Sequence, residues 1–287
     1  MDDFDPMREL RVDVEDLTSP AALSLLERHM WLEFWRAPGV EAVEEQRFET
    51  RFYGPVQAHA IAASLETPLL NVVLGAAEPA AVEEGHLAEA LDWIESLDLD
   101  CRVLVRPDCE ESGAAEDHLN RRGYRRTAFL VRFTRDASPP EFPEPPGIEV
   151  DEWTEQAEGF SGYFAEGFDL GFPEDHVFDC LPGRRPWRCY VAVDEHEEGA
   201  GAALMAMHFQ VAQLAFAVTR ASARGRGVHM ALLRRRILDA AAAGARVLIA
   251  DAEEPLDDPD GPSRATRNLL RAGFKQVSAQ PVWRPPE

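Results

Sequence analysis

The sequence predicts an α/β protein made of two similar halves, each with a mixed, mostly antiparallel sheet flanked by helices. A proline-rich stretch over residues 136–147 divides the 287-residue chain into halves of nearly equal length, each long enough for a small domain. Apolar strand patterns alternate with helical patterns in both halves. The elements also follow a similar order, as a tandem duplication would give, although two unrelated α/β domains would share much of that order.

The C-terminal half contains the clearer patterns. A short strand, a helix ending near Phe168 and a loop rich in glycine and proline precede three further strands, the last two expected to pair antiparallel. A long amphipathic helix then ends before Gly244, which is a plausible C-cap. The expected ranges are 148–153, 188–194, 201–209, 214–218 and 247–250 for strands, and 228–243 and 263–274 for helices.

The N-terminal half repeats the later part of this plan. We expect strands at 71–77 and 101–105 around a helix at 83–97. The segment His118–Tyr124 then parallels residues 267–274, since each is a helix followed by glycine, an aromatic residue and a strand. We therefore predict domains at 1–137 and 148–287, joined by a linker at 138–147.

An Arg-Gly-Arg-Gly loop joins the strand ending at Val218 to the long helix. Gly225 and Gly227 permit backbone conformations that a Cβ would forbid. The free amides of a helix beginning near Val228 would point at a ligand in this loop, which predicts an anion site. The spacing fits neither a nucleoside triphosphate loop nor a dinucleotide fingerprint. A solvated surface turn or a short nucleic-acid contact are the alternatives for such a loop in isolation.

The context of the loop resembles the GNAT superfamily of acyl-CoA-dependent N-acyltransferases. Its signature, R/Q-x-x-G-x-G/A between a strand and a long helix, is matched by Arg224 to His229 except at the sixth position. The segment Ser263–Phe274 is similar to the next helix of that family, with Asn268 and the pair Gly273 and Phe274 at matching positions. The resemblance is specific over roughly residues 185–284. It implies the GNAT fold, acetyl-CoA as acyl donor, and direct attack of an amine on the thioester in a ternary complex.

The resemblance also implies roles for particular residues. Backbone groups of Val218, Thr219 and Arg220 would hold the pantetheine arm. Amides of Gly225, Arg226, Gly227, Val228 and His229 would bind the pyrophosphate, with added charge from Arg224 or Arg226. Asn268 would reach the cofactor from its helix.

Catalytic residues are less clearly indicated. Leu269 stands where many members of the family carry a tyrosine that protonates the leaving thiolate. Asp251 and Glu253, just after the 247–250 strand, are the candidate general bases. The alternative is that both are solvated loop carboxylates.

The first copy lacks the features of the second at the corresponding loop. Residues 76–86 contain no arginine and three glutamates, which would repel a pyrophosphate. This half resembles the degenerate copy of tandem GNAT proteins, so we expect one acetyl-CoA per chain.

Composition restricts the partners. The net charge of −23 disfavours nucleic acids and anionic membranes and favours a cationic small-molecule amine, although it could equally reflect the host. No apolar run is long enough to span a bilayer, residues 1–16 lack signal-peptide features, and the four cysteines lack metal-site spacing. We expect a cytoplasmic enzyme without a metal, and the sequence leaves a homodimer open. The predicted function is N-acetylation of a primary amine of a small molecule; the alternative is a CoA-binding or ligand-sensing protein without efficient turnover.

Overall fold

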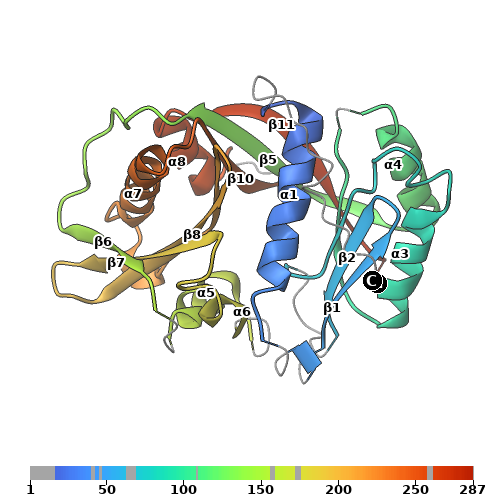
Figure 1. Ribbon diagram of the computed structural model, residues 1–287, viewed down its shortest axis with the longest axis horizontal. Coiled ribbons are helices and arrows are strands. Elements are labelled where there is room, and N and C mark those ends of the chain that lie inside the picture. Colours follow the sequence, from blue (N-terminus) through green and yellow to red (C-terminus); the bar gives the residue numbers. More distant parts are fainter. Residues whose placement is uncertain are drawn as a thin grey trace.

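A single continuous sheet runs through the whole molecule (Figure 1). The computed structural model describes residues 17–39, 43–44, 47–62, 69–107, 109–155, 159–171, 176–256 and 261–286. The described residues form eleven strands in the order β1-β2-β3-β4-β11-β5-β10-β9-β8-β7-β6. The N-terminal segment that we expected to lack a signal peptide lies outside the described residues.

The N-terminal half begins with a helix that the sequence patterns did not predict, α1. Ser19 caps this helix by accepting a hydrogen bond from the Ala22 amide. The elements of this half are α1 (Pro20–Trp35), β1 (Phe48–Tyr53), β2 (Val56–Ile61), β3 (Val72–Leu74), α3 (His86–Ser96), β4 (Arg102–Leu104), α4 (Ser112–Arg121) and β5 (Arg125–Asp136). The strand β3 is shorter than the predicted 71–77, because Gly75 turns the chain with a positive φ of 78°.

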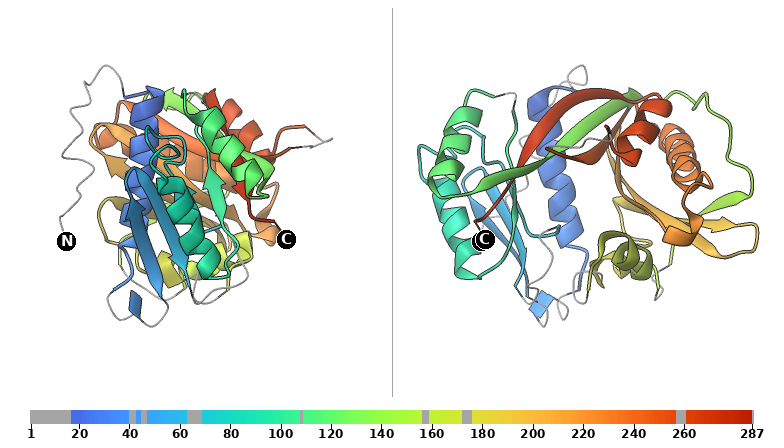
Figure 2. Two further views of the ribbon diagram at one scale, coloured as in Figure 1. Left: turned by 90° about the vertical axis from the view of Figure 1, so that its right-hand side faces the viewer. Right: turned by 180° about the vertical axis from the view of Figure 1, so that it is seen from behind.

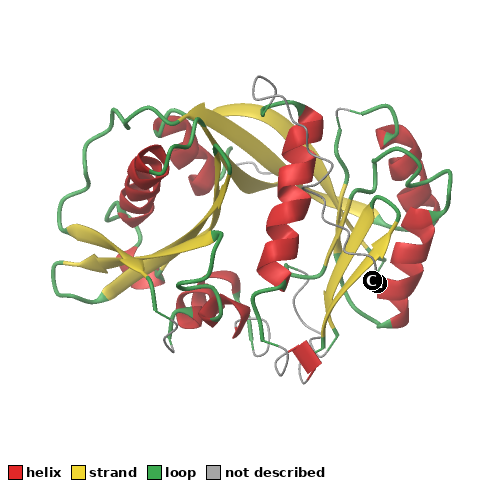
Figure 3. Ribbon diagram, viewed as in Figure 1, coloured by secondary structure: helices red, strands yellow, loops and turns green. Residues whose placement is uncertain are grey.

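The C-terminal half follows the predicted order. Its elements are β6 (Ile148–Trp153), α5 (Ser161–Phe168), α6 (His176–Asp179), β7 (Trp187–Asp194), β8 (Gly199–His208), β9 (Val211–Thr219), α7 (Val228–Ala242), β10 (Val247–Pro255), α8 (Arg264–Arg271) and β11 (Lys275–Arg284). One difference affects the site: β10 continues to Pro255, so Asp251 and Glu253 belong to a strand rather than to the loop after it. Residues 137–147 carry neither helix nor strand (Figure 3).

The two halves share one topology. In each, two antiparallel pairings lead to a strand that pairs parallel with the next strand after a crossover helix, as in β3-α3-β4 and β9-α7-β10. A second helix and a last strand then follow, α4 and β5 in one half and α8 and β11 in the other. This correspondence of order and pairing confirms two tandem copies of one fold.

The last strands of the two halves are exchanged. The strand β5 pairs with β10 of the C-terminal half, and β11 pairs with β4 of the N-terminal half. The two exchanged strands pair antiparallel with each other in the middle of the sheet. Figure 2 shows them crossing between the halves, β5 in green and β11 in red. The predicted domains 1–137 and 148–287 are thus interleaved in the sheet, because each half supplies one strand to the other's part of it.

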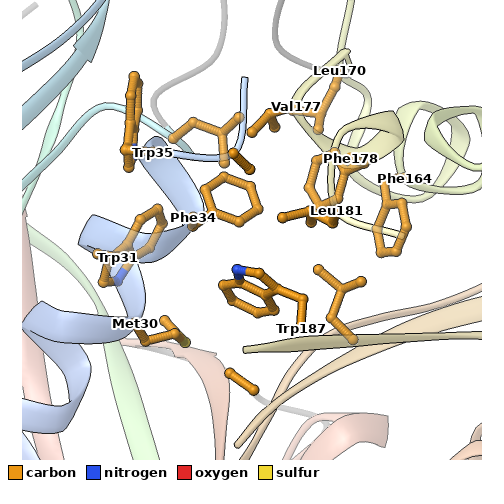
Figure 4. Close-up of a cluster of buried hydrophobic side chains, with 14 of the residues drawn as sticks. Met30, Trp31, Phe34, Trp35, Phe164, Leu170, Val177, Phe178, Leu181 and Trp187 are labelled. Atoms are coloured by element: carbon orange, nitrogen blue, oxygen red, sulfur yellow. The ribbon is translucent and has the colours of Figure 1, made fainter. Parts of the chain in front are cut away.

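The helix α1 packs between the two halves (Figure 1). Leu23 and Leu26 form a buried cluster with Val211 of β9 and Ile249 of β10. At the other end of the helix, Phe34 packs edge-to-face on Trp187 with ring centroids 5.8 Å apart. Figure 4 shows α1 side chains meeting those of α5, α6 and β7 in one apolar cluster. Burial of this size stabilises the arrangement by about 2 kcal/mol for each large side chain.

Candidate active site

A cleft of about 840 Å³ lies between β9, the loop after it, α7 and α8. Eight of the ten residues predicted to bind a cofactor line it. These are Val218, Thr219, Arg224, Gly225, Gly227, Val228, His229 and Asn268. The structure therefore brings the two separate sequence segments, 218–229 and 268, to one place.

The loop entering α7 has the backbone geometry of an anion cradle. Gly225 and Gly227 adopt positive φ angles of 81° and 90°, as their residue type permits. No side chain caps the N-terminus of α7. Within the described part of the chain, the amides of Val228, His229 and Met230 have no recorded hydrogen-bond partner. Unpaired amides at the positive end of a fifteen-residue helix attract an anion.

The arginines of this loop differ in their surroundings. Arg224 is exposed and lines the cleft. Arg226 lies outside the cleft lining and donates to Asp194 over 2.7 Å. Arg220 also lies outside it, with its guanidinium 4.5 Å from the centre of the Tyr163 ring and 3.1 Å from Glu166. Of the two arginines expected to add charge to a pyrophosphate site, only Arg224 is directed to the cleft.

Further positive charge comes from α8, which sequence reasoning did not single out. Arg264, Arg267 and Arg271 all line the cleft. Their spacing of three and four residues places them on one face of the helix, so the periodicity of 264–271 could have revealed them. Together with Arg224 they give the cleft four guanidinium groups in a strongly acidic protein.

His229, the residue that departs from the family signature, has a defined partner. Asn268 Nδ2 lies 3.0 Å from His229 Nδ1. Burial, with the nearby charge of Arg236, lowers the pKa of His229 to about 4. The ring is therefore neutral at pH 7, and when Nδ1 accepts from the amide the ring proton is on Nε2. The side chain thus joins the two predicted cofactor-binding segments.

The sheet opens beside the cleft. The strands β9 and β10 pair with each other over four residues, Val211–Leu214 with Val247–Ala250. Beyond these residues both strands continue, but they no longer pair with each other. At this point β9 has a bulge, because Leu204 pairs with Ala215 and Ala203 with Ala217, which leaves Phe216 without a partner. Phe216 has a φ of 37°, in the left-handed region. The separation of the strands gives access from one face of the sheet to the other.

A second cavity of about 650 Å³ occupies this opening and extends toward α1. It shares four lining residues with the cleft, namely Phe168, Ala217, His229 and Ala265. Asp251, Glu253 and Leu269 also line it. Ligands in the two cavities would therefore meet at the separated strands, beside His229.

The two carboxylates predicted as bases lie on this cavity in ion pairs with arginines of the N-terminal half. Arg132 of β5 donates to both oxygens of Asp251, over 2.8 and 3.0 Å, and to Glu27 of α1 over 2.7 Å. Arg102 of β4 lies 2.5 Å from Glu253 Oε2. Glu27, which also lines the cavity, has its pKa raised by burial, against the opposing effect of Arg132. The strand exchange brings these partners together.

In the corresponding loop of the N-terminal half, an amide at the start of the helix is used in a hydrogen bond within the loop. Leu87, the second residue of α3, donates its amide to Ala81 over 2.7 Å. The equivalent amide in α7 is that of His229, which has no recorded partner in the described residues. The glutamates of the 76–86 loop add negative charge next to this helix terminus.

Other kinds of site lack support in the part of the chain that the structure describes. No group of three His, Cys, Asp or Glu side chains there is arranged to hold a metal ion. All four cysteines are free thiols. None of the described helices is long and apolar enough to cross a membrane.

Comparisons with known proteins agree with this geometry. The sequence matches no protein-family model and no curated protein. In structure, the chain is similar to a GCN5-related N-acetyltransferase from Sphaerobacter thermophilus, with a TM-score of 0.58 and 17% identity over 81% of this chain and 78% of that one. A GCN5-related N-acetyltransferase from Kribbella flavida gives a TM-score of 0.57 and 13% identity over 86% of this chain and 93% of that one.

A tandem GNAT protein from the clavulanic acid biosynthesis pathway is also similar, with a TM-score of 0.53 and 13% identity over 81% of this chain and 79% of that one. These likenesses, with the duplicated topology, confirm that the chain has the GNAT fold in its tandem form. At such low identity they establish the fold, while the reaction and its substrates have to be argued from the site.

Proposed function

We propose that this protein is an N-acetyltransferase that transfers an acetyl group from acetyl-CoA to a primary amine of a small molecule. The observation that carries the proposal is the junction of two cavities at the separated strands β9 and β10. One cavity has unpaired helix amides and arginines suited to an anionic donor. The other is enclosed by both halves of the chain and suits an acceptor.

The residues of the cleft fit acetyl-CoA. The amides from Gly225 to His229 would bind its pyrophosphate, and Arg224 with the α8 arginines would add charge-assisted hydrogen bonds. Residues Val218–Arg220 would hold the pantetheine arm, and Asn268 would fix the His229 ring beside it. Neither Gly225 nor Gly227 places a side chain in the path of the donor.

In the reaction, the amine nitrogen attacks the thioester carbonyl carbon, the carbon–sulfur bond breaks, and the CoA thiolate leaves. The amine must first lose a proton from its ammonium form. We propose Asp251 or Glu253 as the acceptor of this proton, directly or through water. Glu253 is the better placed, because its side chain is 51% exposed and Arg102 contacts only one of its oxygens among the described residues. The nitrogen loses its second proton as the amide forms, and this proton passes through water to the thiolate, because Leu269 has no acidic group.

A second function, CoA-dependent sensing without efficient turnover, is favoured by two observations. Leu269 lines the cavity where the family's acid would stand, and both oxygens of Asp251 are held by Arg132. Under this alternative, acetyl-CoA would bind but thiol release would not depend on an added amine.

Two measurements test the proposal. Calorimetric titration should show acetyl-CoA binding to the full chain, and an assay of CoA thiol should show release that depends on a primary amine. Acetyl-CoA binding with no amine-dependent release over a broad panel would favour sensing instead. Absence of acetyl-CoA binding would refute both functions.

A further inference from the structure

The cavity beside the cleft has an apolar wall made largely by the N-terminal half. Trp31 of α1 and Phe216 of β9 face each other edge-on with ring centroids 6.0 Å apart. The other apolar lining residues include Met30, Leu69, Leu130 and Phe168. A wall of this kind favours a substrate with an aromatic or bulky apolar body, since burying apolar surface stabilises the complex.

The lining also contains three carboxylates, each paired with an arginine. The three carboxylates are those of Glu27, Asp251 and Glu253. Asp251 and Glu253 are two residues apart on β10, so both side chains lie on the same face of the sheet. Among the described residues Arg102 contacts only Oε2 of Glu253, so Oε1 of Glu253 can accept a hydrogen bond from an ammonium group.

The arginines of the lining are already engaged. Arg102 pairs with Glu253 and Arg284 with Asp100. Arg236 donates to the backbone carbonyls of Leu204, Ala215 and Leu232. A carboxylate on the substrate would have to share Arg102 with Glu253 or Arg284 with Asp100, or reach Arg236, which is only 1% exposed. Like-charge repulsion in the first two cases and burial in the third make an amino acid a poor acceptor.

One buried polar atom of the cavity lacks a partner. Gln213 lines the cavity with 3% of its surface exposed, and its Oε1 has no hydrogen-bond partner in the described structure. Gln213 is in register with Ile249, two residues before Asp251 on the same face of β10. Because buried acceptors are almost always paired, an unpaired one on a cavity indicates a donor supplied by the ligand. An ammonium or amine N–H next to Asp251 would supply it.

We propose that the acceptor is an arylalkylamine, a primary amine with an aromatic body and no carboxylate. Its ammonium lies toward Gln213, Asp251 and Glu253, and its ring packs against Trp31 and Phe216. This inference rests on the proposed function for the reacting amine, but the binding of the amine can be measured separately. A cavity of about 650 Å³ is in the size range of sites for small molecules.

The experiment uses matched amines on the full chain. The probes are 2-phenylethylamine, phenylalanine, which adds a carboxylate, n-butylamine, which lacks the ring, and spermidine, which adds charge and lacks the ring. We expect calorimetric binding of 2-phenylethylamine to the CoA complex, and a kcat/KM at least about tenfold above those of the other three, as 1.4 kcal/mol of selective contact would give.

Two variants locate the binding site. Trp31→Leu removes the aromatic wall, and Ala215→Leu narrows the cavity from β9, since Ala215 lines it. Each should weaken 2-phenylethylamine binding at least about fivefold and leave acetyl-CoA affinity within about twofold, because neither residue lines the cleft. Phe209→Leu is the control, because Phe209 is 77% exposed and outside the cavity lining. It should change nothing.

The outcomes separate the two proposals. Binding of 2-phenylethylamine to the CoA complex, with no thiol release for it or for any amine of the broad panel, would support this ligand class and favour sensing over the acetyltransferase function. Thiol release that favours phenylalanine, n-butylamine or spermidine would support the function and overturn the acceptor class. Failure of 2-phenylethylamine to bind at about 10 mM, where even weak ligands are detected, would also overturn it, as would equal effects of Phe209→Leu and Ala215→Leu.

Discussion

Arg224 and Arg226 stand two residues apart in one loop, but only Arg224 lines the cleft, because Arg226 is held by Asp194. We therefore expect Arg224→Ala to weaken acetyl-CoA binding about tenfold, the value of one charge-assisted hydrogen bond. Arg226→Ala is the matched control and should change the affinity less than about twofold. Isothermal titration of the three proteins measures this. Equal losses for the two variants would contradict the assignment of the phosphate contact to Arg224.

The two candidate bases differ in how strongly the fold depends on them. If Glu253 is the base, Glu253→Gln should lower kcat by about 10²–10⁴ and leave acetyl-CoA affinity unchanged. Asp251→Asn breaks a pair with Arg132, whose side chain is only 2% exposed, and should also cost about 3 kcal/mol of stability. Steady-state kinetics and thermal unfolding of both variants distinguish catalytic from structural loss. Wild-type rates for both variants across pH 6 to 9, on an acceptor amine that the assay has confirmed, would place the base elsewhere.

At the scale of elements, the two equivalent helices α7 and α3 differ at their N-termini. The α7 loop is open and basic, whereas the α3 loop uses the Leu87 amide internally and carries glutamates. We expect one acetyl-CoA per chain, bound at α7. Equilibrium dialysis gives the number of sites, and Gly227→Asp, which places a carboxylate at the α7 loop, should abolish the measured site. That variant would also bring a Cβ to 2.7 Å from Pro145, so its folding must be verified. Two sites of similar affinity would show that the first copy is functional.

The strand β11 belongs by sequence to the C-terminal half but packs in the N-terminal core. Trp283 is 3% exposed in the cluster formed by α3, α4 and their strands. Trp283→Ala should therefore cost about 3–5 kcal/mol and accelerate hydrogen exchange in α3. Trp153→Ala, on β6 at the far edge of the sheet, should leave exchange in α3 unchanged. The same exchange rates in α3 for both variants would contradict the strand exchange.

At the scale of the whole molecule, acid should destabilise the fold through buried histidines. Burial lowers the pKa of His59 to about 3 and, with the neighbouring His29, that of His208 to about 3. Since an unfolded histidine has a pKa near 6.5, the unfolded chain binds more protons. The stability from these neutral rings is fully present above about pH 6.5 and is lost as pH falls toward 3.

The melting temperature should accordingly fall between pH 7 and pH 4.5. His59→Gln removes one of the groups that takes up a proton, so its melting temperature should fall less over the same interval. Differential scanning calorimetry at both pH values measures the difference. A variant with an equal or steeper fall would show that His59 is not protonated on unfolding.

The sequence by itself determined the features that depend on neighbouring residues. The glycines at 225 and 227, the amphipathic helix after them and the strand patterns of the C-terminal half are local signals. The GNAT fold was expected from the resemblance of residues 224–229 and 263–274 to that family. The α8 arginines were readable in the same way from their periodicity. The sequence patterns missed α1, whose apolar residues surround much of the helix because it is covered by both halves.

Only the tertiary structure decided which partners meet. The local patterns of the equivalent strands β5 and β11 do not indicate that each pairs across the halves rather than within its own half. That exchange sets Arg132 beside Glu27 and Asp251, which lie 105 and 119 residues away in the chain. It also places the charged end of β10, with Asp251 and Glu253, in the wall of a cavity. Pairing over such distances depends on the packing of the entire sheet, and for that reason the cavity that we propose as the acceptor site became visible only in the folded molecule.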